Sequence, residues 1–494
     1  MCIRDRAWQH WPWSVWRQSF QAFERWCALA VSEVPGVEPH HRHLVGYACR
    51  QVCESLSPAN FLPSNPELLQ RTLETGGANL VSGFQHLQQD LLQALAPHHA
   101  RALHSQGAPR FRVGHELAVT PGKVVYRNHL IELIQYAPTQ PRVLAEPVLI
   151  VPAWIMKYYI LDLTPANSLV RFLVDQGHTV YCISWRNVDA GDRSLSMDSY
   201  QDSGVMAALA AIDQLQPGVP VHATGYCLGG TLLAISAATL ARAADHRLAS
   251  LTLLAAQTDF SEPGDLQLFI DESQVSMLES MMHQQGTLSG AQMVAAFQLL
   301  QSRELIFNRM VHDYLLGERA PLMDLVAWNA DTTRMPYRMH TEYLRRLFLR
   351  NELAAGHYLV DGRPVSLRDL RLPTFLVGTE RDQIAPWKSV FKLHQLCDSE
   401  LTFVLTNGGH NAGIVSEPGH PRRHYRIATT APGALRPSPD RWLAATSPQD
   451  GSWWPAWSAW LRAHSSAAAV APPPNAGAGA PALGDAPGLY VLQD

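Results

Sequence analysis

Residues 225–230 of this 494-residue chain read Gly-Tyr-Cys-Leu-Gly-Gly, and they decide the fold. The apolar segment 219–224 before them predicts a strand, and the small residues at 231–238 predict a helix. Glycines on either side of Cys227 permit a sharp turn between the two, because a Cβ atom there would clash. The backbone N–H of Leu228 would then lie at a helix N-terminus, where it can stabilise an oxyanion. The pattern indicates a nucleophile elbow with Cys227 as the nucleophile; a buried structural cysteine beside a glycine turn is the alternative.

Two predicted strands further along the chain end in loops that carry an acid and a histidine. The first, at 374–378, is followed by Glu380 and Asp382, and the second by His410. Along the sequence, the triad residues that accompany an elbow of this kind follow in the order nucleophile, acid, histidine. We therefore expect His410 to take the proton of Cys227. Asp382 would orient the imidazole, with Glu380 as the rival acid.

Strand candidates alternate with helical stretches over residues 111–464, which indicates a mostly parallel sheet. Besides those already named, the candidates are 123–127, 131–136, 148–151, 179–184, 250–254 and 401–405. A long helical insertion near 262–350 follows a central strand, and we expect it to cap the site. A fixed subdomain is the alternative. The predicted fold class is α/β: an α/β-hydrolase-like sheet with a helical cap, preceded by a helical N-terminal domain.

The two ends of the chain differ from this catalytic domain. Residues 1–110 predict a helical N-terminal domain with a stripe of aromatic residues at three- and four-residue spacing. The stripe favours helix packing, and a binding face is the alternative. Residues 465–494 form an Ala/Pro/Gly-rich tail that we expect to be flexible, with 486–491 as the segment that could dock on the body.

Composition excludes several classes of protein. The net charge of −4 and the scattered arginines argue against a nucleic-acid-binding protein. No apolar run reaches the roughly 18 residues of a membrane span. Seven cysteines, with no signal-peptide pattern, favour free thiols in a reducing cytoplasm. Cys49 and Cys53 have helical spacing but no second ligand pair nearby in the sequence. We therefore interpret them as packing residues and expect no metal.

Six further motifs accompany the elbow in a fixed order. They are Leu-Ser-Pro-Ala-Asn-Phe-Leu at 56–62, Lys-Tyr-Tyr-Ile-Leu-Asp-Leu at 157–163, Ser-Trp-Arg-Asn at 184–187, Trp-Asn-Ala-Asp-Thr at 328–332, Asp-Gln-Ile-Ala-Pro-Trp at 382–387 and Gly-Ser-Trp-Trp-Pro at 451–455. With these motifs the chain resembles the class I polyhydroxyalkanoate synthases, or poly(3-hydroxyalkanoate) polymerases, over roughly residues 55–494. The set is far more specific than any one motif.

The resemblance implies an activity and a site. The nucleophile, acid and histidine of the family match Cys227, Asp382 and His410. The implied reaction polymerises (R)-3-hydroxyacyl-CoA, with 3-hydroxybutyryl-CoA as the expected substrate, through a cysteine-bound acyl group and with release of CoA. No cofactor is implied, since the CoA thioester is the substrate. The expected partners are a second copy of the chain and the surface of cytoplasmic polymer granules. Neither a membrane-spanning segment nor binding to nucleic acid is expected.

Some positions depart from the family pattern or stay open. Gln383 stands where the family often has His, and Met156 where it often has Asn, so a hydrogen bond from that Asn is absent. The backbone N–H of Ile155 remains the expected second oxyanion donor. Arg345 could pair with a CoA phosphate or with a carboxylate of the cap. Residues 1–6 match nothing in the family, and they need not be native coding sequence.

Two other functions compete with polymer synthesis. A cysteine α/β hydrolase of the dienelactone type shares the elbow, but it would be near half this length and would lack the motifs at 328–332 and 451–455. A granule-binding protein without activity is the second alternative, against which the complete triad argues. Release of CoA with chain growth separates a polymerase from a hydrolase, and any turnover excludes an inactive protein.

Overall fold

The computed structural model describes residues 6–32, 34–95, 111–300, 306–319, 323–466, 468–474 and 483–493. The chain divides into two compact units. The first joins Met1–Arg110 to Gln292–Met323, and the second joins Phe111–Ala291 to Asp324–Asp494. The insertion expected near 262–350 as one cap is thus divided between the units. Of the doubtful residues 1–6, only Arg6 lies within the described residues.

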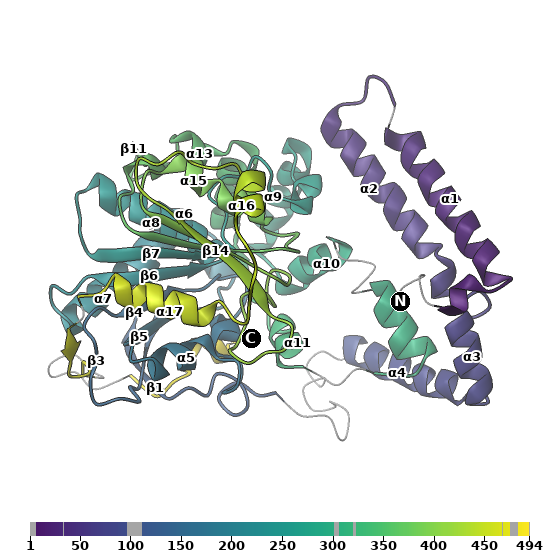
Figure 1. Ribbon diagram of the computed structural model, residues 1–494, viewed down its shortest axis with the longest axis horizontal. Coiled ribbons are helices and arrows are strands. Elements are labelled where there is room, and N and C mark those ends of the chain that lie inside the picture. The colour runs from purple at the N-terminus through teal and green to yellow at the C-terminus, as the bar shows by residue number, and fades with distance from the viewer. Residues whose placement is uncertain are drawn as a thin grey trace. The chain divides into compact units, whose positions relative to one another are not determined.

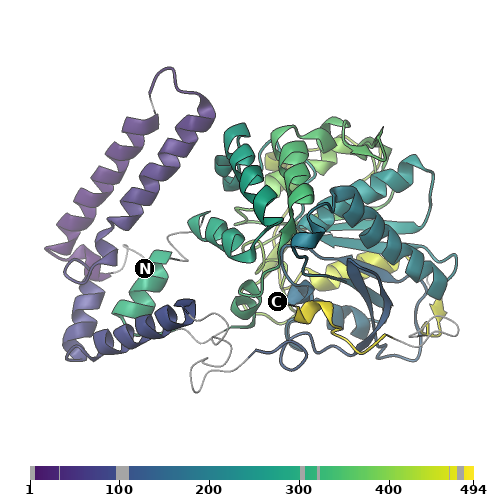
Figure 2. The same ribbon diagram turned by 180° about the vertical axis from the view of Figure 1, so that it is seen from behind.

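The first unit is helical, as the sequence predicts for residues 1–110. Its elements are η1 (Arg6–Gln9), α1 (Trp13–Ser32), α2 (Pro39–Ser55), η2 (Pro58–Asn60), α3 (Pro66–Glu74), α4 (Ala78–Leu95) and η8 (Met310–Leu315). Helices α1 and α2 lie side by side as a hairpin (Figures 1 and 2).

Contacts distant in sequence explain why part of the insertion belongs to the first unit. The Asn79 side chain donates to the carbonyl of Leu315 over 2.7 Å, and the Tyr314 hydroxyl donates to Asp90 over 2.8 Å. Arg319 forms an ion pair with the same Asp90 carboxylate at 2.7 Å. These contacts join η8 and its following loop to α4, and no local sequence pattern reveals them.

A ten-stranded sheet forms the core of the second unit, in the order β1-β2-β5-β4-β6-β7-β12-β13-β14-β15 (Figure 1). The strands are β1 (Gly122–Arg127), β2 (Ile131–Tyr136), β4 (Val148–Val151), β5 (Val180–Trp185), β6 (Val221–Tyr226), β7 (Leu248–Leu254), β12 (Thr374–Thr379), β13 (Leu401–Thr406), β14 (His424–Thr430) and β15 (Gln449–Asp450). Strands β5 to β13 in this order are parallel, and the flanking strands are antiparallel. The predicted mostly parallel sheet is confirmed, whereas β14 and β15 were not predicted.

Helices cover both faces of the sheet (Figure 1). Alternate strand residues such as Val148 and Ile150 belong to a buried cluster with residues of α5 (Leu169–Asp175) and α17 (Trp454–Ala463). Helix α8 (Leu228–Arg242) packs on β6 and β7. The other elements of this core are β3 (Val143–Leu144), η3 (Tyr158–Asp162), η4 (Ala190–Asp192), α6 (Met197–Tyr200), η5 (Gln201–Met206), α7 (Ala207–Leu215), α13 (Glu352–Ala355), β10 (Leu359–Val360), β11 (Arg363–Pro364), η10 (Leu367–Asp369), α14 (Trp387–Phe391), α15 (Leu393–Leu396), α16 (Pro439–Ala445), β16 (Ala469–Val470) and η11 (Tyr490–Leu492).

The part of the insertion that stays with the second unit is mostly helical. Its elements are η6 (Asp265–Phe269), α9 (Glu272–Gln285), β8 (Thr287–Leu288), α11 (Asp324–Asn329), β9 (Met335–Pro336), α12 (Tyr337–Glu342) and η9 (Tyr343–Leu349), and α10 (Gly290–Leu300) runs across the boundary between the units. Strands β8 and β9 pair antiparallel and join the two stretches of this insertion.

The C-terminal tail is more ordered than the sequence predicts. Strand β16 pairs with β3. The Val124 N–H donates to the carbonyl of Gly484 over 2.9 Å, and Val491 is buried. The expectation of a flexible tail is wrong for β16 and for the stretch at Gly484, because hydrogen bonds to short and edge strands hold them. The burial of Val491 agrees with the expected docking of 486–491. Residues 475–482 lie outside the described part of the chain.

Among the helices within the described residues, none combines the length and the apolar character needed to cross a membrane.

Candidate active site

The predicted elbow lies between β6 and α8. Strand β6 ends at Tyr226, helix α8 begins at Leu228, and Cys227 between them has φ 52° and ψ −125°. This conformation is sterically costly for a residue with a Cβ atom, and it aims the side chain away from both flanking elements. Two backbone hydrogen bonds hold it: the Cys227 N–H donates to Leu254 over 2.9 Å, and the Cys227 carbonyl accepts from Gly230 over 2.9 Å.

The glycines around the cysteine are required by close packing. A Cβ atom on Gly225 would come within 2.4 Å of the Cα of Gly230. A Cβ atom on Gly229 would come within 2.2 Å of the carbonyl oxygen of Val151, at the end of β4. Both distances lie far below van der Waals contact. The glycines therefore let α8 start directly against the strand ends, which puts Cys227 at the carboxyl edge of the sheet.

An acid and a histidine meet at the same edge, after β12 and β13. The His410 Nδ1–H donates to Asp382 Oδ2 over 2.7 Å. The other carboxylate oxygen accepts the backbone N–H groups of Ile384 over 2.9 Å and Ala385 over 2.8 Å. The Thr379 hydroxyl donates to Oδ2 over 3.2 Å and is the fourth donor to the carboxylate. The carboxylate only accepts, so it holds the imidazole with its proton on Nδ1 and leaves Nε2 for a reacting group.

The electrostatics connect this histidine to the cysteine. The Asp382 side chain is fully buried, and that of His410 is 9% exposed. Burial alone would lower the pKa of His410, but the charges of Asp382 and Cys227, and the hydrogen bonds to both, raise that pKa well above its usual value. The three side chains therefore interact in one chain, Cys227–His410–Asp382.

The rival acid lies elsewhere. The Glu380 carboxylate is 3.5 Å from His424 Nε2, and about a third of its side chain is exposed. The structure thus brings Asp382 to His410, and it does not bring Glu380 there.

The two expected oxyanion donors belong to neighbouring strand ends. Leu228 is the first residue of α8, so its N–H has no acceptor within the helix. Ile155 lies in the loop after β4, the strand that pairs with β6. The Thr333 N–H donates to the carbonyl of Ile155 over 3.2 Å. The Thr333 hydroxyl donates to the carbonyl of Trp154, which fixes the peptide that carries the Ile155 N–H. Leu228 and Ile155 are both buried, which would strengthen a hydrogen bond to an oxyanion.

Three further residues lie near Cys227 and His410 that were not predicted as site residues. The Tyr226 ring lies against the His410 ring, with centroids 5.7 Å apart. The Tyr226 hydroxyl donates to Asn411 over 2.6 Å. Tyr343 of the insertion is half-buried, and desolvation of its hydroxyl together with the charge of Cys227 raises its pKa well above the usual value. Their positions next to Cys227 and His410 in the sequence could have indicated Tyr226 and Asn411, but no local signal marks Tyr343.

The structure also places the residues that were left open. Arg345 forms ion pairs with Glu279 at 2.5 Å and with Glu272 at 2.7 Å, so a carboxylate of the insertion is its partner here. Gln383 is exposed. Met156 packs against the buried cluster and forms an isolated bridge with the residue at position 332.

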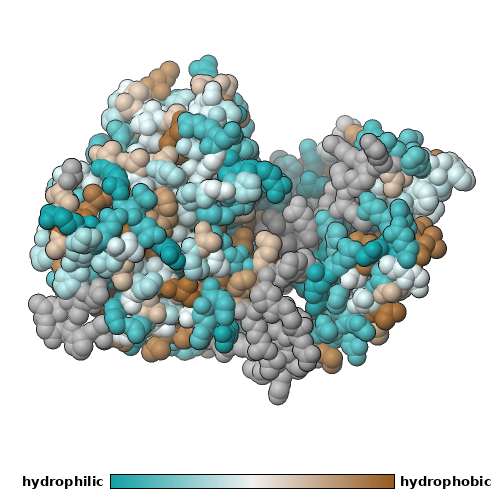
Figure 3. Space-filling model, turned by 60° about the horizontal axis from the view of Figure 1, so that its bottom comes forward, coloured by the Kyte–Doolittle hydropathy of each residue, from teal (hydrophilic) through white to brown (hydrophobic). Residues whose placement is uncertain are grey.

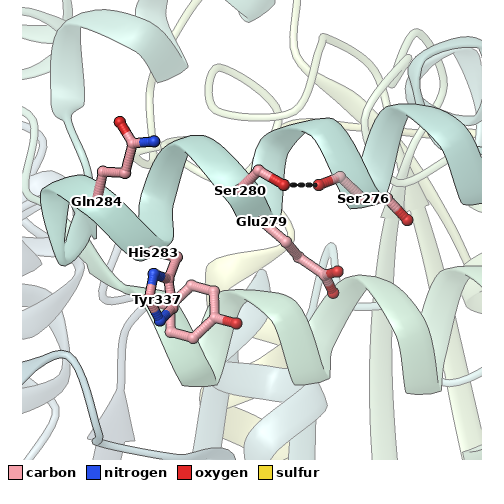
Figure 4. A pocket seen from close by; sticks show the side chains of 6 residues that line it. All are labelled: Ser276, Glu279, Ser280, His283, Gln284 and Tyr337. Carbon is pink, nitrogen blue, oxygen red and sulfur yellow. Dashed lines mark hydrogen bonds between the residues drawn. The ribbon is translucent and has the colours of Figure 1, made fainter.

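A shallow polar hollow lies beside these ion pairs (Figure 4). It is lined by Ser276, Glu279, Ser280, His283 and Gln284 of α9 and by Tyr337 of α12. The Ser280 hydroxyl donates to the carbonyl of Ser276 over 2.9 Å. None of its lining residues belongs to the triad.

Comparison with known proteins identifies the family. A family model described as "Poly-beta-hydroxybutyrate polymerase (PhaC) N-terminus" matches residues 2–173, and an "alpha/beta hydrolase fold" model matches residues 146–417. The chain is 40% identical to the poly(3-hydroxyalkanoate) polymerase of Methylorubrum extorquens, over 99% of this chain and 80% of that protein. The chain belongs to the poly(3-hydroxyalkanoate) polymerase family.

Other members of the polymerase family are similar over most of their length. A poly(3-hydroxyalkanoate) polymerase subunit of Rhizobium etli is 38% identical, over 99% of this chain and 76% of that protein. Its counterpart in Cupriavidus necator is 36% identical, over 91% of this chain and 76% of that protein. The predicted family and α/β-hydrolase fold are thereby confirmed, and this polymerase-family chain is an acyltransferase.

Proposed function

We propose that the chain joins (R)-3-hydroxyacyl groups from CoA thioesters into a polyester and releases CoA, with 3-hydroxybutyryl-CoA as its substrate. Membership of the polymerase family supports the reaction class. The observation that carries the mechanism is the linked arrangement of Cys227, His410 and Asp382 at the edge of the sheet.

The first step would transfer the acyl group to the enzyme. The Cys227 thiolate attacks the thioester carbonyl, and the N–H groups of Leu228 and Ile155 stabilise the oxyanion. When the intermediate collapses, the bond from carbon to the CoA sulfur breaks. The CoA thiolate then takes the proton from His410, and the acyl group stays on Cys227 as a thioester. Exchange of one thiol for another is nearly isoenergetic, so the acyl group keeps its reactivity.

The second step would extend the chain. His410 takes the proton from the 3-hydroxyl of another unit or of the growing polymer, and the alkoxide attacks the Cys227 thioester. An ester bond forms, the bond from carbon to the Cys227 sulfur breaks, and the thiolate returns beside the imidazolium. Asp382 stabilises that cation and keeps the proton on Nδ1. The residues assigned here need neither a metal nor a nucleotide cofactor for these steps.

The site must also exclude water, because water would hydrolyse the acyl-enzyme. The insertion contributes Tyr343, whose desolvated hydroxyl lies within electrostatic range of Cys227. Asn411, next to the histidine, donates to Asn329 of α11 over 3.4 Å. We propose that the insertion opens to admit substrate and closes during acyl transfer.

The same proposal places the enzyme at polymer granules in the cytoplasm, as a homodimer. The aromatic stripe of α1 supports adhesion: Phe20 is buried, while Trp16, Phe23 and Trp26 are 45%, 40% and 65% exposed. On the face shown in Figure 3, hydrophobic residues are interspersed with hydrophilic ones. The exposed aromatic side chains of α1 would therefore supply the apolar contacts with the polymer.

Incubation of the purified chain with 3-hydroxybutyryl-CoA tests the proposal. We expect release of free CoA together with insoluble polymer, and an acyl-enzyme whose added mass maps to the peptide containing Cys227. Release of CoA with free 3-hydroxybutyrate and no polymer would instead establish a hydrolase. Absence of turnover under conditions in which the Methylorubrum extorquens polymerase works would overturn the assignment.

A further inference from the structure

Three cysteines converge in the first unit, whereas the residues assigned to catalysis belong to the second. Cys27 of α1 and Cys49 and Cys53 of α2 place their sulfur atoms within 4.8 Å of one another. Cys49 and Cys53 are four residues apart and share a helix face. The packing of α1 on α2 brings Cys27 to them, although it is 22 residues before Cys49 in the sequence. Spacing within α2 reveals only the pair Cys49 and Cys53, because the third thiol comes from another helix.

The surroundings of the thiols are charged. A small hollow at the cluster is lined by all three cysteines and by Glu24, Arg50 and Glu54, together with Ala28 and Gly46. Glu24 lies three residues before Cys27, so its carboxylate is on the same side of α1. Three thiolates and one carboxylate would give a divalent cation a net charge of −2, and Arg50 beside them offsets part of that charge.

The hairpin formed by α1 and α2 has little core of its own. Within the described residues, Phe20 is the buried side chain of α1, and Tyr47 and Cys53 are those of α2. Small helical assemblies with so few buried side chains usually need a disulfide, a metal or a partner to hold them. A cross-link at Cys27 would join the two helices where apolar packing is sparse.

We propose that Cys27, Cys49 and Cys53 bind one zinc ion that links α1 to α2. Glu24 supplies the fourth ligand. Zinc lies about 2.3 Å from thiolate sulfur in a tetrahedral site, which puts the sulfurs roughly 4 Å apart, so the cluster needs only a small contraction. Thiolates select zinc over hard cations such as magnesium. A disulfide would use two of the three sulfurs, and a reducing compartment disfavours it.

Metal binding by the full-length chain tests the inference. The purified chain is reduced, stripped of metal with a chelator, and equilibrated with zinc before unbound metal is removed. We expect one zinc per chain, and with cobalt in place of zinc we expect the thiolate charge-transfer band and the visible bands of a tetrahedral site. Bound zinc should also raise the melting temperature of the first unit, since only the folded hairpin assembles the site.

Single substitutions identify the ligands. Loss of a residue that only hydrogen-bonds to a metal ligand typically weakens metal affinity by about 10- to 100-fold. We expect a larger loss of zinc affinity in each of the variants Cys27→Ser, Cys49→Ser and Cys53→Ser. Glu24→Gln should weaken it by about 10-fold and keep the thiolate band. Cys397→Ser is the matched control, because this cysteine lies in the second unit and should leave metal content unchanged. Circular dichroism of each metal-free variant checks that the helices still form.

Three results would overturn the proposal. The first is a reduced wild-type chain that retains no zinc after equilibration. The second is zinc content that stays the same in all three cluster variants, which would place the metal elsewhere. The third is a disulfide within the cluster that forms under cytoplasmic redox conditions and blocks zinc uptake. An unchanged affinity in Glu24→Gln would refute the fourth ligand alone.

Discussion

Substitution of Asp382 by Asn should separate the two chemical steps of the enzyme. In the wild-type chain, Oδ2 of Asp382 accepts from His410 Nδ1–H, while Oδ1 accepts from the N–H groups of Ile384 and Ala385. Asn can keep Oδ1 toward the two backbone donors, but it then presents an NH₂ group to His410. The imidazole must respond by moving its proton to Nε2, and in that tautomer it cannot accept a proton from a reacting group.

The cost of this change should differ between a thiol and an alcohol. A thiol is a much stronger acid than an alcohol, so attack by the cysteine sulfur depends less on a competent base than attack by a hydroxyl does. We expect acylation in Asp382→Asn to fall by about 10- to 100-fold. The substrate hydroxyl has no comparable ionised fraction. Its attack should fall by about 10⁴-fold, or about 5 kcal/mol of transition-state stabilisation, as in a serine triad with the same substitution.

Rapid-quench measurements can follow both steps. Asp382→Asn is mixed with 3-hydroxybutyryl-CoA and quenched in acid, and mass spectrometry of the intact chain counts the acyl units on the enzyme. We expect a burst of CoA and a singly acylated chain that persists, whereas the wild-type chain carries on to longer oligomers.

Two matched variants serve as controls. Glu380→Gln removes a carboxylate two residues away that pairs with His424, and it should leave both steps near wild-type rates. Thr379→Val removes one hydroxyl donor to Asp382 but keeps the charge, so its effect should be small and equal in both steps. Equal loss of acylation and elongation in Asp382→Asn, or a comparable loss in Glu380→Gln, would refute the division of roles.

Three further predictions concern the same site. Cys227→Ala should reduce polymer formation to about a thousandth or less while keeping the melting temperature close to wild type, and Cys227→Ser should be strongly impaired; near wild-type polymer yield in Cys227→Ala would contradict the assignment. The His410 pKa, followed by NMR of labelled imidazole, should decrease from wild type to Cys227→Ala and further to Asp382→Asn, because the Asp382 charge is the larger of the two that raise it; the reverse order would refute the proposed electrostatics. Since the folded pKa lies above the unfolded value of about 6.5, the imidazolium stabilises the fold fully below about pH 6.5, and this contribution is lost as the pH rises through the folded value. Hydrogen exchange within 262–291 and 334–350 should be faster than in the sheet and should slow when a non-hydrolysable acyl-CoA analogue binds; uniformly slow exchange that the analogue leaves unchanged would favour a fixed subdomain.

Local patterns explain how much of the fold could be predicted. The elbow at Cys227 and the strands around it have strong local signals: short apolar segments bounded by glycine and polar loops. Asp382 and His410 follow such strands directly, so sheet topology alone brings their loops to one edge. Strand β14 (His424–Thr430) lacks this signal, because its residues are mostly half-exposed and include His and Arg. It pairs with β13 through backbone hydrogen bonds that side-chain patterns do not encode.

Other features depend on contacts that no local pattern reports. The division of the insertion follows from hydrogen bonds such as that between Asn79 and Leu315, which are 236 residues apart. Similarly, Cys27 joins Cys49 and Cys53 only because of the register between two helices, which spacing within one helix cannot give. Arg345 illustrates a third case: the sequence leaves its partner open, and the positions of Glu272 and Glu279 on α9 decide it.

Three sequence motifs that are far apart in the chain meet around the loop that carries Ile155. The Trp328 indole donates to the carbonyl of Lys157 over 2.8 Å, and the Trp185 indole donates to that of Pro152 over 2.8 Å. The Thr333 hydroxyl donates to the carbonyl of Trp154, on the N-terminal side of Ile155. Each of these hydrogen bonds occupies one carbonyl group of the loop and so fixes the direction of that peptide plane.

This anchoring has a consequence for the proposed cap. An oxyanion donor acts only if its N–H points at the reacting oxygen before the reaction begins. Two of the residues that fix this loop, Trp328 and Thr333, belong to the insertion itself, so the stretch around them cannot open without loosening the Ile155 peptide. Motion that admits substrate should therefore be confined to α9, α12 and η9, and the 328–333 segment should act with the sheet as part of the catalytic framework. On this argument the family motif at 328–332 serves to position a backbone donor.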